Sequence, residues 1–390
     1  MKRIITLLIT VILTFSAVDP GIIFAQESKD SLEIQSKSAV LMEPTSGKVI
    51  YEKNAHEKLR PASVTKIMTL LLIFEALDNG TIKLEDEVVV SEHAASMGGS
   101  QVYLEPGEIQ TVHDMIKCIA IASANDASVA MAEHIAGSEL SFVNAMNNKA
   151  KELGMVNTNF MNSNGLDHDE HLTTAYDIAL MSQELITKYP QIFEYTTIWQ
   201  DSIIHRTKRG EEEFGLTSTN KLIKWYNGAT GLKTGSTSQA LYCLSGTAER
   251  NGMQLIGVVM AAPDYKTRFD EVMKLLDYGF ANVSVYEDKL KGNILQVVPV
   301  KRGKINTVEA IVKDNFSYVL GKEDSANEIT KDIIIPESIQ APIQKGQVIG
   351  EVVYKLAGQE IGKIEIVAKD EVEETTFGFS FSKVLRMLFK

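Results

Sequence analysis

The sequence is poor in cysteine, in basic charge and in long apolar runs. Its 390 residues include only two cysteines, Cys118 and Cys243, which are too few for a disulfide framework. Both lie in apolar segments, so we predict buried, free thiols. Acidic residues outnumber basic ones by 51 to 39, and the net charge of −12 argues against a nucleic-acid partner, whose phosphates it would repel. The length predicts two or three domains.

An apolar run over residues 4–18 follows two basic residues at the N-terminus, and it is short for a membrane span. Ala25 offers a small residue for cleavage, so residues 1–25 are expected to be a secretory signal peptide. An uncleaved membrane anchor is the alternative. Either interpretation predicts an exported, extracytoplasmic protein.

The stretch Pro61-Ala62-Ser63-Val64-Thr65-Lys66 leads into a segment that is apolar nearly all round, which is typical of a buried helix. Proline fits the first turn of a helix, where a missing N–H costs nothing. Ser63 and Lys66 are three residues apart, so on a helix their side chains share a face. The helix N-terminus adds unpaired N–H groups and partial positive charge. These groups together suit a nucleophile, although Ser-x-x-Lys also occurs by chance.

Two short apolar strands, 38–42 and 49–51, flank a Pro-Thr-Ser-Gly turn and predict a hairpin. Helical spacing after Thr111 predicts a capped helix that is interrupted by the polar tetrapeptide Ser-Ala-Asn-Asp at 123–126. Such a tetrapeptide between two apolar helices is either a capped turn or a functional site.

A polar loop over 162–177 contains His168 and His171. Its histidines and carboxylates raise the alternative of a metal site, but the loop offers no helical pair of histidines. Thr174 and Asp177 are typical of a capping pair for a helix over 178–186.

From Gly228 the pattern changes to three adjacent antiparallel strands, with Asn251-Gly252 as a hairpin turn and Lys233 on or beside the first strand. A helix over 269–280 follows. Residues 283–372 contain several β-rich runs separated by glycine and charged turns, which predict a small β domain.

The last residues, 376–390, alternate apolar and aromatic side chains with lysine and arginine. A helix of this length is too short to span a bilayer but can lie in one. We therefore predict an amphipathic tail that attaches to the outer face of the cytoplasmic membrane.

Three motifs stand in chain order: Ser63-Val64-Thr65-Lys66, Ser123-Ala124-Asn125 and Lys233-Thr234-Gly235. The ordered set resembles the penicillin-recognising serine enzymes, the DD-peptidases and β-lactamases. The resemblance covers almost the whole chain and is closest to the serine-type D-alanyl-D-alanine carboxypeptidases, the low-molecular-mass penicillin-binding proteins. The stretches 91–100 and 341–346 look like the sporulation-associated branch of that family.

This resemblance implies an α+β fold. Residues 36–281 would form a catalytic domain like that of the serine transpeptidases and β-lactamases, with an antiparallel sheet and helices on both sides. A small all-β domain over 283–372 and the amphipathic helix over 376–390 would follow.

Within the three motifs, Ser63 is expected to be the acyl-ester nucleophile, Lys66 its general base and Ser123 a proton relay to the leaving amine. A serine hydroxyl needs a nearby base, and Lys66 can serve only when neutral. Its pKa must therefore fall by about 3 units from ~10.4, which costs about 4 kcal/mol. Burial and the like charge of Lys233 both lower that pKa.

The resemblance implies an oxyanion hole from the N–H groups of Ser63 and Ser236. Arg268 matches the family's carboxylate-binding arginine, the alternative being an exposed position at a helix start. Ser236 stands where many relatives carry histidine, which leaves the deacylation rate and substrate preference open. The residues expected to bind substrate are Asn125, Lys233, Thr234, Gly235, Ser236 and Arg268.

The expected function is hydrolysis of the terminal D-Ala-D-Ala bond of peptidoglycan stem pentapeptides through a Ser63 acyl-enzyme, without metal or other cofactor. β-Lactam antibiotics would bind covalently at the same serine. The alternatives are a β-lactamase, which the extra domain and tail disfavour, a DD-endopeptidase of the same fold, or a non-catalytic cell-wall-binding protein.

Overall fold

The computed structural model describes residues 32–207, 210–379 and 381–382. The predicted signal peptide over 1–25 lies outside these residues, and so does the end of the predicted tail, 383–390. All of the helices and strands below belong to the compact unit that begins at Ile34.

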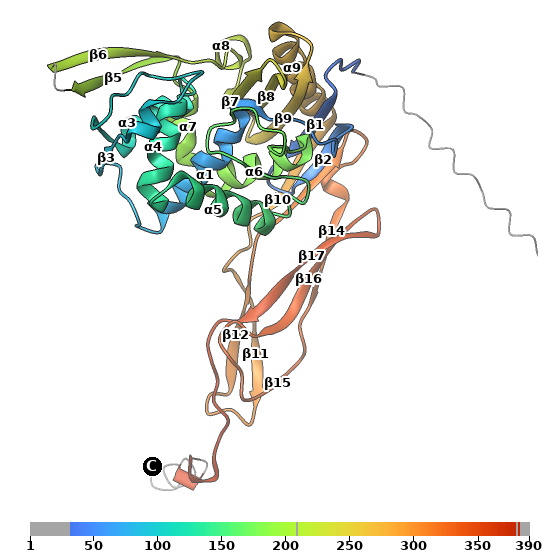
Figure 1. Ribbon diagram of the computed structural model, residues 1–390. Helices are drawn as coiled ribbons and strands as arrows, with labels where there is room; N and C mark the ends of the chain where they lie inside the picture. The colour runs from blue at the N-terminus through green and yellow to red at the C-terminus, as the bar shows by residue number, and fades with distance from the viewer. Residues whose placement is uncertain (1–31, 208–209, 380, 383–390) are drawn as a thin grey trace, which may run out of the picture. The chain divides into compact units, whose positions relative to one another are not determined.

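A five-stranded antiparallel sheet, in the order β2-β1-β9-β8-β7, is the centre of the first part of this unit (Figure 1). The predicted N-terminal hairpin forms its edge, and the three predicted later strands complete it. Its strands are β1 (Ser38–Glu43), β2 (Lys48–Lys53), β7 (Ala229–Thr237), β8 (Leu241–Arg250) and β9 (Met253–Ala262).

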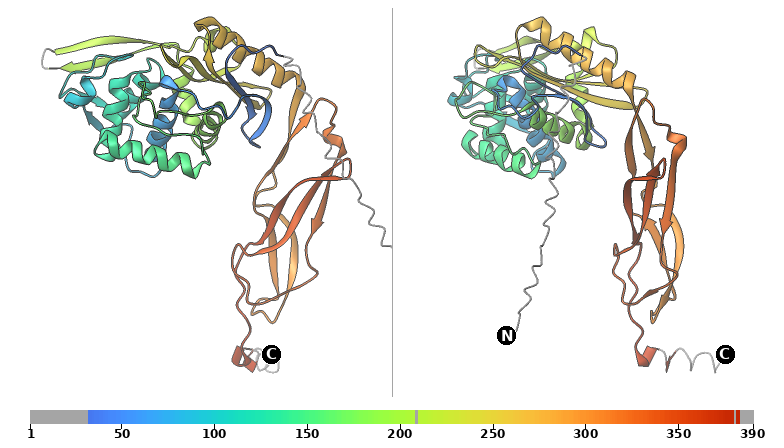
Figure 2. Two further views of the ribbon diagram at one scale, coloured as in Figure 1. Left: turned by 45° about the vertical axis from the view of Figure 1, so that its right-hand side comes forward. Right: turned by 90° about the vertical axis from the view of Figure 1, so that its right-hand side faces the viewer.

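Helices cover both faces of this sheet, as predicted (Figure 2). Successive residues of a strand point to opposite faces. On β8, a Cβ at Gly246 would lie 2.6 Å from Val272 of α9 (Tyr265–Asn282), whereas the hydroxyl of Ser245 lies 2.9 Å from that of Ser182 on α6 (Ala175–Lys188). The sheet is therefore a buried layer between α9 and α6.

The helix behind Ser63, α1 (Lys66–Asp78), is buried nearly all round, as its composition predicted. It packs in one core with helices that precede the sheet's last three strands. The other elements here are α2 (Glu92–Ala95), α3 (Val112–Ala120), α4 (Asn125–Ala136), α5 (Glu139–Glu152), α7 (Phe193–Thr196), α8 (Leu222–Trp225), the 3-10 turns η1 (Ala62–Thr65) and η2 (Pro190–Ile192), and the strand pairs β3 (Glu87–Val89) with β4 (Ile109–Thr111) and β5 (Gln200–Thr207) with β6 (Gly210–Thr217).

The predicted helix caps are present, with one difference. The Thr111 hydroxyl accepts a hydrogen bond from the N–H of Asp114 at 3.1 Å, and Thr174 accepts from Asp177 at 3.0 Å. The helix after Thr174 begins at residue 175 and not at 178, because Thr174 is its N-cap. The Asp177 carboxylate accepts from the N–H of Asn157 at 3.1 Å and so ties the helix start to the preceding loop.

Residues after α9 form β structure, as their composition predicted. A six-stranded sheet in the order β14-β16-β17-β12-β11-β15 has its own apolar core, in which the rings of Phe316 and Tyr354 stack with centroids 3.7 Å apart. The elements are β10 (Val283–Asp288), β11 (Ile294–Lys301), β12 (Thr307–Val312), β13 (Phe316–Gly321), η3 (Ala326–Glu328), β14 (Ile329–Ile334), β15 (Ile339–Gln340), β16 (Val348–Leu356) and β17 (Gln359–Ala368).

Both cysteines are buried and free, as predicted. Across the described residues, the structure contains no helix with the length and apolar character that crossing a bilayer requires. Exposed phenylalanines nevertheless mark the described start of the tail, at Phe377, Phe379 and Phe381.

Candidate active site

Ser63 lies in the 3-10 turn η1, directly before α1. Side chains three residues apart eclipse one another in a 3-10 turn. Lys66 is the first residue of α1, and its Nζ lies 3.1 Å from Ser63 Oγ. The structure therefore brings the serine and the lysine of the first motif into hydrogen-bonding distance.

The Lys66 amine is fully buried and has two further oxygen neighbours. Its Nζ lies 2.5 Å from Oδ1 of Asn125 and 2.7 Å from the carbonyl oxygen of Asn164. A neutral amine has two N–H groups and one lone pair. When both N–H groups donate to these oxygens, the lone pair is left for the hydroxyl of Ser63.

Burial lowers the pKa of Lys66 well below its ordinary value, and the positive charge of Lys233 lowers it further, against an opposing effect of Asp126. Burial also lowers the pKa of Lys233 to about 7, with a contribution from the charge of Arg268. Two buried lysines with depressed pKa values favour a neutral amine beside Ser63 at neutral pH.

The polar tetrapeptide at 123–126, whose last two residues begin α4, belongs to the same site. Ser123 adopts the left-handed backbone conformation, with φ of 64°, and its hydroxyl accepts a hydrogen bond from Lys233 Nζ at 2.8 Å. Lys233 also donates to the carbonyl of Thr234 at 3.1 Å. Because Ser123 accepts from the lysine, its own O–H proton remains available for another acceptor.

Strand β7 passes very close to the turn that carries Ser63, and Gly235 makes this approach possible. A Cβ at Gly235 would lie 2.7 Å from the carbonyl oxygen of Pro61 and 3.0 Å from the backbone N of Ser63. Any larger residue would push β7 away from the serine. The glycine thus keeps the N–H of Ser63 beside the strand that continues into Ser236.

Arg268 is 4% exposed, so the alternative of an exposed helix-start position is wrong. Its guanidinium donates to the carbonyl of Gly235 at 3.0 Å and lies 4.9 Å from the ring centroid of Tyr265. Burial lowers the pKa of Arg268. Within the described residues its Nε has no hydrogen-bond partner. The arginine is therefore a buried cation next to the strand of the third motif.

These groups surround a pocket of about 270 Å³. The sequence predicted Ser63, Ser123, Thr234, Gly235, Ser236 and Arg268 among its lining residues. It missed five others: Ser100, Ser218, Thr219, Lys221 and Tyr265.

Of the missed residues, Thr219 contacts a motif residue directly, since its hydroxyl lies 2.7 Å from that of Thr234. It follows the β5–β6 hairpin, in a segment without a recognisable motif. Tyr265 precedes Arg268 by three residues on α9, and this helical spacing could have predicted that both side chains face the pocket.

Neither Lys233 nor Asn125 lines this pocket, although the sequence predicted that both bind substrate. The Oδ1 of Asn125 faces Lys66, and its Nδ2 donates to the carbonyl of Gly98 at 2.7 Å. In this structure the asparagine therefore holds the lysine. Its role in binding the substrate amide stays a prediction.

The polar loop over 162–177 contributes a backbone carbonyl, that of Asn164, to the surroundings of Lys66. A Cβ at Gly165 would lie 1.9 Å from the carbonyl oxygen of Ala62, so the loop packs directly on the turn of Ser63. His171 Nε2 lies 2.9 Å from the hydroxyl of Thr65, and burial lowers the pKa of His171 to about 4, with a smaller effect of His168. Among the described residues no three His, Cys, Asp or Glu side chains cluster as metal ligands would.

The fold and this arrangement define a class: a serine hydrolase of the penicillin-recognising type, in which a buried lysine lies beside the serine of the first motif. Comparison with known proteins specifies the family. Residues 24–264 match the peptidase S11 family, D-alanyl-D-alanine carboxypeptidase, and residues 280–374 match the C-terminal domain of penicillin-binding protein 5. The chain belongs to the peptidase S11 family of D-alanyl-D-alanine carboxypeptidases.

The chain is 45% identical to the D-alanyl-D-alanine carboxypeptidase DacF of Bacillus subtilis, over 97% of this chain and 96% of the relative. It is 34% identical to the carboxypeptidase DacC of Escherichia coli, over 92% of this chain and 89% of the relative. The structure of penicillin binding protein 5 from Haemophilus influenzae superposes with a TM-score of 0.76 at 32% identity, covering 88% of this chain and 98% of that one. These matches confirm the predicted family, fold class and enzyme class.

Proposed function

We propose that the chain removes the terminal D-alanine from peptidoglycan stem pentapeptides through an acyl-ester on Ser63. The main support is the position of Lys66, whose Nζ lies 3.1 Å from Ser63 Oγ. Asn125 Oδ1 and the carbonyl oxygen of Asn164 accept the two N–H groups of the neutral amine. A base held in this way can take the hydroxyl proton as the oxygen attacks the carbonyl of the penultimate D-alanine.

Acylation forms the Ser63 ester and releases D-alanine. Ser63 Oγ forms a bond to the carbonyl carbon, its proton passes to Lys66, and the peptide C–N bond breaks. The departing D-alanine nitrogen receives a proton from the Ser123 hydroxyl, which Lys233 Nζ contacts at 2.8 Å. The proton that Lys66 took then replaces the one that Ser123 gave up, so Lys66 is neutral again. Water attacks the ester, Lys66 takes a proton from the water and gives it to Ser63 Oγ as the ester C–O bond breaks, and the shortened peptide leaves with a free carboxyl group.

The oxyanion of each tetrahedral intermediate would accept hydrogen bonds from the N–H groups of Ser63 and Ser236. Support comes from Gly235, which lets β7 run against the nucleophile's turn. One such donor typically contributes ~10²–10³ in rate.

The terminal carboxylate of the substrate would bind at the cationic end of the pocket. Arg268 and Thr234 line this end, and Lys233 lies behind it with Nζ 3.1 Å from the Thr234 carbonyl oxygen. A carboxylate would give the buried Arg268 guanidinium a charged partner. This arrangement selects peptides that end in a free carboxylate over internal peptide bonds, which distinguishes a carboxypeptidase from a DD-endopeptidase.

β-Lactams would acylate the same serine, because their strained amide presents a carbonyl and a nearby carboxylate to the same groups. A structural relative, penicillin-binding protein D2 of Listeria monocytogenes, has been solved in its ampicillin-bound form. It superposes with a TM-score of 0.54 at 32% identity, covering 64% of this chain and 99% of that one.

The test combines covalent labelling with turnover. Intact mass after mixing with penicillin, peptide mapping of the adduct and D-alanine release from a pentapeptide are measured for wild type and Ser63→Ala. We expect one adduct on Ser63 in the wild type, and neither adduct nor D-alanine release in the variant. An adduct on another serine in Ser63→Ala would refute the assignment, and rapid hydrolysis of the penicilloyl adduct would indicate a β-lactamase.

We further propose that residues 1–25 are removed on export and that residues 376–390 attach the enzyme to the outer face of the cytoplasmic membrane. The described start of that tail exposes Phe377 and Phe381, whose rings stack with centroids 6.2 Å apart. Exposed aromatic side chains next to basic ones suit an anionic lipid surface. Deleting 376–390 should release the enzyme from membranes with hydrolysis of soluble peptide unchanged; a truncated form that still sediments with membranes would rule out the tail as the anchor.

A further inference from the structure

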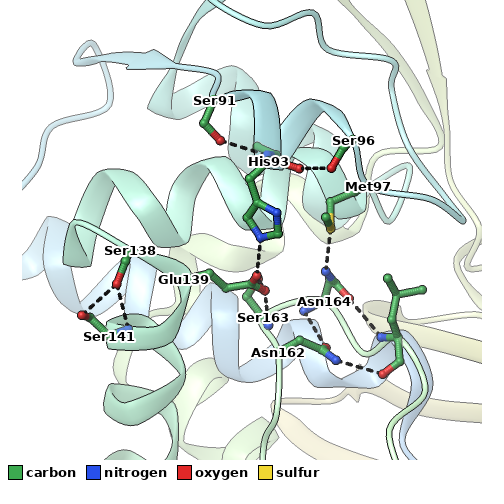
Figure 3. Close-up of polar contacts among 12 residues, drawn as sticks. Ser91, His93, Ser96, Met97, Ser138, Glu139, Ser141, Asn162, Ser163 and Asn164 are labelled. Atoms are coloured by element: carbon green, nitrogen blue, oxygen red, sulfur yellow. Dashed lines mark hydrogen bonds and ion pairs between the residues drawn. The ribbon is translucent and has the colours of Figure 1, made fainter.

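A single carboxylate joins two segments that are distant in the sequence (Figure 3). Glu139 is the first residue of α5, and its Oε1 accepts hydrogen bonds from the N–H of Ser163 at 3.0 Å and from the Ser163 hydroxyl at 2.7 Å. Its Oε2 lies 3.0 Å from Nε2 of His93 on α2. The Glu139 side chain is 17% exposed and Ser163 is fully buried, so the contacts between these two are largely shielded from water, whereas the His93 side chain is 52% exposed.

Each of the two segments continues to an oxygen that helps to hold the Lys66 amine. One leads to Asn164, whose carbonyl oxygen lies 2.7 Å from Lys66 Nζ. The other leads to Gly98, whose carbonyl accepts from Asn125 Nδ2 at 2.7 Å and so orients Oδ1 of that asparagine toward the same amine. Both N–H acceptors of the lysine therefore depend on segments that Glu139 ties together.

Ser163 is completely buried between two helices. Thr69 of α1 donates to its carbonyl oxygen at 2.5 Å, while Glu139 of α5 accepts from its N–H and hydroxyl. Without the carboxylate, the buried N–H and hydroxyl of Ser163 lose their acceptor. Because unpaired buried donors are costly, the segment around Ser163 would move toward water. A displacement of Ser163 moves its neighbour in the chain, Asn164, whose carbonyl oxygen contacts Lys66 Nζ.

We propose that Glu139 is a positioning residue for the reaction: through Ser163 it fixes the Asn164 carbonyl, and through His93 it steadies the segment that orients Asn125, so that the Lys66 lone pair points at Ser63. The proposal rests on the function proposed above, because it requires Lys66 to act as the base.

Loss of Glu139 has two consequences for the lysine. One N–H of Lys66 loses its acceptor, so the amine can rotate its lone pair away from Ser63 and the maximal acylation rate falls. The ammonium form also loses a hydrogen bond, so the acidic limb of the pH profile moves to lower pH. The charged neighbours that act on Lys66, Lys233 and Asp126, are unchanged in the variant.

The experiment measures the second-order rate constant of penicillin acylation between pH 5 and 10, together with the melting temperature, for Glu139→Ala. Asn147→Ala is the matched control. Asn147 also lies on α5 and exchanges two hydrogen bonds of 2.8 Å with the backbone of Phe160, four residues before Asn164. Both variants should melt below wild type. Only Glu139→Ala should lose roughly tenfold to a hundredfold in maximal rate and show the shifted acidic limb.

Two further variants keep the proposal testable if Glu139→Ala folds poorly. Glu139→Gln retains an oxygen that can accept from Ser163, so it should recover most of the rate, while Ser163→Ala should lose part of it and show coupling to Glu139→Ala in a double-mutant cycle. Equal rates and pH profiles for Glu139→Ala and Asn147→Ala would overturn the proposal, and so would additive effects of Glu139→Ala and Ser163→Ala. A failure of the proposed function is distinguished from a failure of the Glu139 proposal by the labelling experiment: penicillin would then still label the Ser63→Ala variant.

Discussion

The regions before and after the end of α9 use charged residues in opposite ways. Around Ser63, Lys66 and Lys233 are buried and their pKa values are depressed. In the six-stranded sheet, lysines pair with carboxylates across neighbouring strands at the surface, as Lys363 does with Glu351 at 2.9 Å, with side chains 58% and 36% exposed. Buried charges are costly, whereas exposed ion pairs contribute little. The buried lysines of the first region therefore lower the stability of the fold but make the site reactive, whereas the exposed pairs of the second region have little effect on stability.

The largest effect is expected from removing the base. Lys66→Met keeps much of the apolar stem, removes the buried amine, and should lower the acylation rate by roughly 10²–10⁴-fold. Rapid-quench labelling with penicillin measures it. A melting temperature at or above that of wild type would accompany the loss, because the cost of burying this amine, which must lose its proton on folding, is gone. Near-normal acylation by this variant would show that another group activates Ser63.

A change in the pH dependence of stability is expected next, from Lys233. Its pKa is about 7 in the folded state and 10.5 ordinarily, so between these values the unfolded chain binds a proton that the folded chain does not. Stability therefore rises with pH across this window, by about 1.4 kcal/mol per pH unit for this one group. Lys233→Met should lose that part of the slope.

Chemical denaturation at several pH values between 7 and 10.5 measures the slope. Lys355→Met, in the six-stranded sheet, is the control, since this exposed lysine pairs with Asp332 at 2.7 Å and its pKa is raised. If Lys233→Met and Lys355→Met change the slope equally, the two regions do not differ as described.

A smaller effect should come from Arg268→Ala, and only on substrates with a free terminal carboxylate. Hydrogen bonds to charged groups are worth roughly 1.5–3 kcal/mol, which corresponds to a loss of about 10- to 150-fold in kcat/KM. A peptide with an amidated C-terminus has no charge to lose and should be affected much less. Comparing both substrates with both proteins isolates carboxylate recognition; equal losses would assign Arg268 to support of the fold.

The smallest effect is expected in the second region. Removing the exposed Lys363 side chain with Lys363→Ala should leave D-alanine release unchanged and the melting temperature within error of wild type. Differential scanning calorimetry at low and high salt measures it. A clear loss of stability would mean that surface pairs hold this sheet together.

The motif residues of the site could be predicted because their chemistry depends on residue type at short spacing. Ser63 and Lys66 share one turn, and the glycine of the third motif is required where β7 meets that turn. The contribution of Asn164 could not be predicted, since it is made by a backbone carbonyl that any residue type could supply. The positioning role proposed for Glu139 could not be predicted either, because acidic residues are common at the start of a helix for electrostatic reasons alone.

Much of the fold could be predicted from the periodicity of apolar residues and from the residues typical of turns. Two of the three hairpins of the large sheet were marked by turn residues. The pairing of β1 with β9 joins strands more than two hundred residues apart and leaves no local signature. The helix after Thr174 began earlier than its apolar pattern suggested, because the cap and not the first apolar residue sets the boundary.

The claim that a neutral Lys66 activates Ser63 is tested by measuring the protonation state of this lysine in the resting enzyme. Lysine side chains labelled at Cε report their pKa by NMR titration, and comparison with Lys66→Arg and Lys233→Arg assigns the two buried signals. We predict that Lys66 titrates well below 10.5 and that Lys233 titrates near 7. A Lys66 signal that titrates at or above its ordinary pKa would contradict the claim, because the amine beside Ser63 would then be charged and unable to act as the base.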